Sequence, residues 1–81
     1  MKEHLIDSWG PTQLSLLRQF LAQAEPGDKI IADINLVKDN GGEGWIHHCL
    51  RAASMGAPQG VTEKVKIEYA ELNMPTLKPE L

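Results

Sequence analysis

The chain has 81 residues, of which 42% are hydrophobic and 23% are charged, and its formal net charge at pH 7 is −3. This composition is typical of a globular domain and excludes a disordered, highly charged segment. The single cysteine excludes a fold built on disulfides, and no apolar run approaches the roughly 18 residues that span a bilayer. We therefore expect one cytoplasmic domain over residues 1–72, followed by an extended, proline-containing tail over residues 73–81.

The first predicted helix begins at Pro11, because proline fits the first helical turn, where its missing N–H is not needed. Apolar residues then recur at helical spacing, namely Leu14, Leu17, Leu21 and Ala24, with Leu16 and Phe20 beside them. Pro26 and Gly27 end the helix, since proline disfavours helical geometry in the residue before it. The segment is therefore predicted to be an amphipathic helix with one buried face.

Residues 29–38 fit two patterns. As a helix capped by Asp28, the segment carries an apolar stripe of Ile30, Ile31, Ile34 and Val37. As a strand, it carries an apolar face of Ile30, Ala32, Ile34 and Leu36. Residues 39–42 (Asp-Asn-Gly-Gly) then interrupt the chain, and Glu43 places negative charge near the start of the next helix. The pattern leaves helix and strand open for residues 29–38.

A further helix is predicted over residues 44–55, and a strand over residues 61–70. The apolar face of the helix consists of Ile46, Cys49, Leu50 and Ala53, and its polar face of His47, His48, Arg51 and Ser54. The strand segment alternates with period two, so Val65, Ile67 and Tyr69 share its apolar face. Lys64 and Lys66 share the exposed face of this predicted strand.

The sequence carries no pattern typical of catalysis or metal binding. His47, His48 and Cys49 are consecutive, so on a helix their side chains diverge by about 100° from one to the next. A zinc pair or a thiol–base pair needs side chains that converge. The carboxylates that could do acid–base chemistry lie in or beside turns, where helix capping accounts for them: Asp28, Asp33, Asp39 and Glu43. We therefore expect a protein that is not an enzyme and needs no cofactor or metal.

The polar face of the helix over residues 44–55 is the candidate binding surface. His47, His48 and Arg51 place two imidazoles and a guanidinium on adjoining turns, which can contact base edges, phosphates or a protein partner. Lys64 and Lys66 would extend this basic surface. A solvated helix face, with lysines that discourage unwanted strand addition, explains the same residues without any partner.

The order of the predicted elements resembles winged helix-turn-helix regulators. The stretch that carries the resemblance is Trp45-Ile46-His47-His48-Cys49-Leu50-Arg51-Ala52-Ala53-Ser54-Met55-Gly56, followed by Val65-Lys66-Ile67-Glu68-Tyr69. The resemblance implies a small α+β fold of about three helices with a C-terminal strand or hairpin. It also implies that His47, His48 and Arg51 approach the major groove of duplex DNA, with Lys64 and Lys66 near the backbone.

A second fold remains open if residues 29–38 form a strand. The middle of the chain then becomes a β-α-β unit in a small α/β fold, with its two strands parallel. Two strands alone are marginal, so this fold requires another strand from residues 2–7 or a sheet completed by a second copy of the chain.

Both folds lead to a non-catalytic protein that binds another macromolecule. The winged-helix interpretation predicts a small DNA-binding or transcription-regulatory protein whose partner is duplex DNA. The alternative is a protein-binding adaptor or inhibitor of the kind that phages or plasmids encode, which docks on a larger protein through a strand edge or the tail. A homodimer is compatible with either hypothesis.

Overall fold

The computed structural model describes residues 1–55 and 60–72. Its elements in chain order are β1 (Glu3–Ile6), α1 (Pro11–Ala22), β2 (Lys29–Asp33), α2 (Ile34–Asp39), α3 (Glu43–Ala53), α4 (Val61–Lys64) and β3 (Lys66–Ala70). The small α+β domain expected from the sequence is therefore present. The predicted tail over residues 73–81, and Gly56 at the end of the stretch that carries the resemblance, lie outside the described residues.

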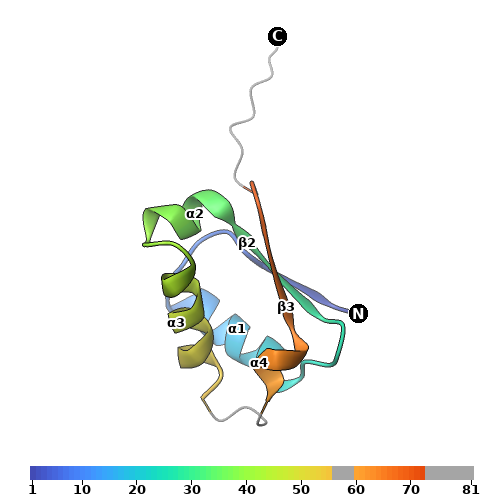
Figure 1. The fold of residues 1–81 in the computed structure, drawn as a ribbon. Coiled ribbons are helices and arrows are strands. Elements are labelled where there is room, and N and C mark those ends of the chain that lie inside the picture. Colours follow the sequence, from blue (N-terminus) through green and yellow to red (C-terminus); the bar gives the residue numbers. More distant parts are fainter. Residues whose placement is uncertain (56–59, 73–81) are drawn as a thin grey trace.

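The three strands form one sheet in the order β1-β2-β3, and both pairs are parallel. Because parallel crossovers are right-handed and both run in the same direction across the sheet, they place their helices on one face. Figure 1 shows α1 and α3 on the same side of the strands. Side chains that point to this side, such as those of Ile6, Ile30 and Ala32, are buried, whereas Leu5 and Glu68 on the other face are exposed.

The hydrophobic core lies between the sheet and the helices, and both predicted helix faces contribute to it. The buried core residues are Ile6, Leu17, Leu21, Ile30, Ala32, Val37, Ile46, Leu50, Ala53 and Val65. Pro11 occupies the first turn of α1, as expected. Trp9 and Trp45 are packed against the core with their rings edge to face, 5.7 Å between centroids. The tryptophans therefore stabilise the contact between the loop before α1 and the start of α3.

Residues 29–38, which fit both a helix and a strand pattern, form a strand followed by a helix. β2 ends at Asp33, whose side chain caps α2 by accepting a hydrogen bond from the backbone N–H of Asn35 at 3.1 Å. The expected N-cap role of Asp28 is wrong. Asp28 is buried, and its carboxylate accepts hydrogen bonds from the backbone N–H groups of Lys2 and Glu25, both at 2.9 Å. Asp28 caps no helix because the residues that follow it form β2, and its carboxylate instead ties the start of β1 to the turn before β2.

The prediction of one strand over residues 61–70 is correct for Lys66–Ala70 and wrong for Val61–Lys64, which form the short helix α4. Gly60 has a φ of 79°, a left-handed conformation that starts this helical turn, and the chain becomes extended at Val65. β3 pairs in parallel with β2, so the strands of the described residues form no hairpin. β1 supplies the strand from residues 2–7 that the β-α-β fold requires.

No helix formed by residues 1–55 and 60–72 has the length and apolar character needed to cross a membrane.

Candidate partner-binding site between α3 and β3

α3 presents the predicted polar face to solvent because its other face is fixed in the core. The helix follows Gly42, whose φ of 89° is a left-handed conformation, and Glu43 lies in its first turn. Ile46, Cys49, Leu50 and Ala53 are buried, as the spacing predicted. His47, His48 and Arg51 are exposed, so the expected outward stripe of imidazole and guanidinium groups is present.

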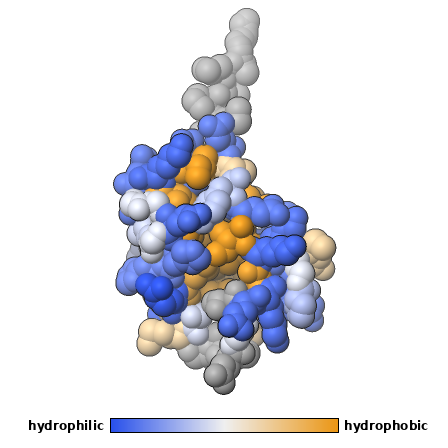
Figure 2. Space-filling model, in the orientation of Figure 1, coloured by the Kyte–Doolittle hydropathy of each residue, from blue (hydrophilic) through white to orange (hydrophobic). Residues whose placement is uncertain are grey.

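A groove separates α3 from β3. Its volume is about 290 Å³, and its lining residues are His47, Leu50, Arg51, Ser54 and Ile67. Leu50 and Ile67 supply apolar surface, while His47 and Arg51, one helical turn apart, supply hydrogen-bond donors at the rim. Figure 2 shows hydrophobic surface between the polar sides of the molecule in the view where α3 and β3 face the reader. The groove therefore combines an apolar floor with a polar, basic wall.

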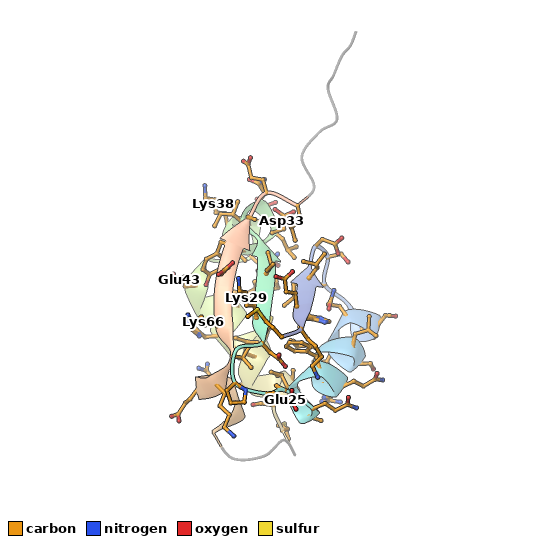
Figure 3. The ribbon with its side chains drawn as sticks, turned by 90° about the vertical axis from the view of Figure 1, so that its right-hand side faces the viewer. Glu25, Lys29, Asp33, Lys38, Glu43 and Lys66 are labelled. Carbon is orange, nitrogen blue, oxygen red and sulfur yellow. The ribbon has the colours of Figure 1, made fainter. Side chains whose placement is uncertain are left out.

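The structure does not bring all of the predicted site residues together. His48 is exposed but is not among the residues that line the groove. Lys64 ends α4 and is not on a strand, so it does not share a strand face with Lys66. Lys66 is in register with Lys29 of β2 and projects from the face of the sheet opposite the helices, as Figure 3 shows. The predicted continuous basic surface is therefore divided between the two faces of the sheet.

The outer edge of β3 is the strand edge of residues 61–70 that the β-α-β fold offers as a dimer or partner surface. The backbone N–H of Lys66 donates to the carbonyl of Asp28 at 3.1 Å, so the backbone groups of Lys66 point to β2. Successive residues of a strand direct their N–H and C=O groups to opposite sides, which means that those of Ile67 and Tyr69 point away from β2. Within the described residues β3 pairs with β2 alone, so these groups form an exposed sheet edge.

The other edge of the sheet is partly covered. The carbonyl of Leu5 in β1 points outward and accepts a hydrogen bond from the side-chain amide of Gln13 at 3.4 Å. The Gln13 carbonyl oxygen in turn lies 2.6 Å from Nε2 of His4, and Gln13 itself is buried at the β1–α1 contact. The two edges therefore differ: α1 protects that of β1, and that of β3 lies beside the groove.

Among the described residues no group of three or more His, Cys, Asp or Glu side chains is placed to hold a metal ion. Burial raises the pKa of the Tyr69 hydroxyl, and the charge of Glu43 raises it further, so this hydroxyl is neutral at neutral pH. The groove volume lies at the lower limit of small-molecule sites, about 300–1,000 Å³.

Comparison of the chain with protein-family models, with curated proteins and with solved structures gave no match.

Proposed function

We propose that the protein is a non-catalytic protein-binding module, an adaptor or inhibitor that takes an extended segment of its partner as an additional strand beside β3. The observation that supports this proposal is the exposed edge of β3 next to the groove between α3 and β3. In strand addition, main-chain hydrogen bonds supply affinity and pockets for alternate side chains supply specificity. In this protein the edge of β3 offers the main-chain groups, and the adjacent groove offers the pocket for side chains.

The groove indicates which partner segment fits. A strand placed against Ile67 and Tyr69 directs every second side chain to the helix side of the sheet, where Leu50 and Ile67 form an apolar surface. Arg51 and His47 at the rim favour a carboxylate or carbonyl acceptor next to the apolar side chain. We therefore expect a partner segment that alternates apolar or acidic residues facing the groove with polar residues facing away.

A proline at position 69 tests this proposal. The N–H of Tyr69 points away from β2, so Tyr69→Pro removes an outward donor without removing a hydrogen bond of the sheet. Tyr69→Ala is the matched control, because it removes the same ring and keeps the N–H. Partners are captured from cell extract on each immobilised variant and identified by mass spectrometry, after circular dichroism has shown that both variants are folded. Proteins held by wild type and Tyr69→Ala, but lost with Tyr69→Pro, are expected; equal capture by all variants contradicts the proposal.

Duplex DNA is a second candidate partner, and the exposed stripe of His47, His48 and Arg51 on α3 favours it. Basic and imidazole groups on one helix can contact phosphates and base edges. Contact with phosphates releases counterions, so binding must weaken steeply with added salt. This proposal uses α3 and does not need the edge of β3.

The variants Arg51→Ala and Lys66→Ala distinguish a specific DNA-binding helix from general charge. Each removes one positive charge, but Arg51 lines the groove and Lys66 projects from the opposite face of the sheet. If α3 binds DNA, Arg51→Ala weakens retention of a duplex at low salt and Lys66→Ala has little effect. Retention that is unchanged by Arg51→Ala, or that is missing in the wild type at low ionic strength, excludes this second function.

A further inference from the structure

We propose that the segment bound at the edge of β3 is β3 of a second copy of the chain, antiparallel and centred on Ile67. The two sheets, each of three strands, then form one continuous sheet with β3 beside β3 at its middle. This inference rests on the proposed function, since it names the partner of the same edge. A two-fold axis relates the copies, and two identical strands related by such an axis through the sheet must pair antiparallel.

The charges of β3 select the register. When Ile67 pairs with Ile67 of the second copy, Lys66 lies directly opposite Glu68, and symmetry repeats this pair on the other side of the axis. Both side chains are exposed on the outer face of the sheet, and opposite charges facing each other across strands stabilise pairing. The Glu68 carboxylate is already oriented by Lys29, with Nζ 3.4 Å from Oε2.

Neighbouring registers lose this complementarity. A pairing centred on Glu68 places the two Glu68 carboxylates opposite each other, and like charges in that position are destabilising. A pairing centred on Tyr69 leaves Glu68 opposite Ala70 and Lys66 opposite Leu72, so neither charge has a partner. The alternation Lys66-Ile67-Glu68 is therefore self-complementary in one antiparallel register.

The helix side of the strands supports the same register. With Ile67 at the centre, Val65 lies opposite Tyr69, and all three have backbone groups that point away from β2. These are the residues that form directly hydrogen-bonded pairs in an antiparallel ladder. Ile67, which is half-buried in one copy, is covered by its equivalent, and the two grooves become continuous. The Gln13 side chain at the Leu5 carbonyl makes the edge of β1 the poorer choice for such pairing.

Charge reversal with rescue tests the register. Analytical ultracentrifugation measures the dimer dissociation constant of the wild type and of Lys66→Glu, Glu68→Lys and the double variant. Each single reversal opposes like charges at two symmetric positions, so we expect dimerisation to weaken roughly tenfold or more. The double variant restores opposite charges and is expected to restore the wild-type constant within about threefold. Single reversals without effect, or a double variant as weak as the singles, overturn the proposed register.

Cysteine trapping tests the same contact directly. Residues 66 and 68 of the two copies form a non-hydrogen-bonded pair, whose Cα atoms lie about 4.5 Å apart, within the range of a disulfide. The double variant Lys66→Cys and Glu68→Cys is expected to form a covalent dimer under mild oxidation. The variant Lys64→Cys is a control on the neighbouring α4, and Cys49 is buried and unavailable. Equal cross-linking through position 64 overturns the proposal.

The outcomes separate this inference from the proposed function. A wild type that is monomeric at its highest usable concentration overturns the dimer. If that monomer still captures other proteins in a manner that Tyr69→Pro abolishes, the strand-binding function stands and only its partner is wrong. A dimer that Tyr69→Pro leaves intact does not use the edge of β3 and overturns this inference, whereas the proposed function is decided by the capture experiment.

Discussion

Leu17→Ala tests how α1 holds the sheet. Leu17 is 0% exposed and belongs to the core between α1, α3 and the strands. Replacing a fully buried leucine by alanine removes apolar contact and leaves a cavity, at a cost of about 2–5 kcal/mol. A domain of this size has a free energy of unfolding of about 5–15 kcal/mol, so the loss is a large fraction of it. At about 4–8 °C per kcal/mol, a loss near 3 kcal/mol lowers Tm by roughly 12–24 °C.

The neighbouring residue offers a matched control. Leu16 is 48% exposed on the same helix, so Leu16→Ala makes the same chemical change with the same helix propensity at a site with little burial. We expect it to cost about 0.5–1 kcal/mol. Urea unfolding followed by far-ultraviolet circular dichroism gives both free energies from one pair of curves.

The test compares the loss of unfolding free energy in Leu17→Ala with the loss in Leu16→Ala. Equal losses for Leu16→Ala and Leu17→Ala would mean that α1 does not present Leu17 to the sheet. A larger loss for Leu16→Ala would mean that the helix is rotated by about 100°, which would move the whole apolar stripe away from the core. Either result refutes the packing described for α1.

Further predictions concern single sites. Backbone hydrogen bonds from Glu25 and Lys2 hold the pKa of the Asp28 carboxyl below its ordinary value. The contribution of this carboxylate to stability is therefore complete above about pH 5 and is lost as the pH falls through the lowered pKa. Between pH 6 and about pH 2, the urea midpoint of Asp28→Asn should fall less than that of the wild type. Burial raises the pKa of the Cys49 thiol. This thiol should therefore react with iodoacetamide at pH 7.5 far more slowly in the native protein than in protein unfolded by urea. Equal reaction rates would contradict the burial of Cys49. Gly42→Ala should lower the free energy of unfolding by about 1 kcal/mol or more, because the φ of Gly42 is 89°. Gly44 lies inside α3 with free space around it, so Gly44→Ala should raise the free energy of unfolding by about 0.5–1 kcal/mol. The urea unfolding curves of the two variants should therefore shift in opposite directions.

Local patterns predicted α1 and α3 because each of these helices has one long buried face. The spacing of Leu17 and Leu21 in α1, and of Ile46 and Leu50 in α3, reports burial against a single surface. The division of residues 29–38 also has a local cause that the sequence contains. Asp33 is both the last residue of β2 and the N-cap of α2, so strand and helix periodicities meet at this carboxylate.

Other features depend on contacts between distant segments, which local patterns do not encode. Gln13 is buried on α1 because it bonds to His4 and to the Leu5 carbonyl of β1, and nothing in its spacing distinguishes it from a surface glutamine. The exposed stripe of α3 was predictable from the opposite apolar face. The separation of Arg51 from Lys66 depends on α3 lying over the face of the sheet that carries Ile67, which leaves Lys66 on the opposite face.

The uncovered face of the sheet connects stability with the proposed dimer. Parallel sheets are normally covered on both faces, yet here Leu5 is 51% exposed on the face opposite the helices. The Lys29–Glu68 ion pair joins β2 to β3 on this same face. Pairing of two β3 strands would add Lys66–Glu68 contacts and extend the row of charged side chains across both copies. In the double reversal Lys66→Glu and Glu68→Lys, Lys29 lies in register with the new glutamate and can exchange one partner for the other. The rescue therefore tests the dimer register while the ion pairing of this face is conserved.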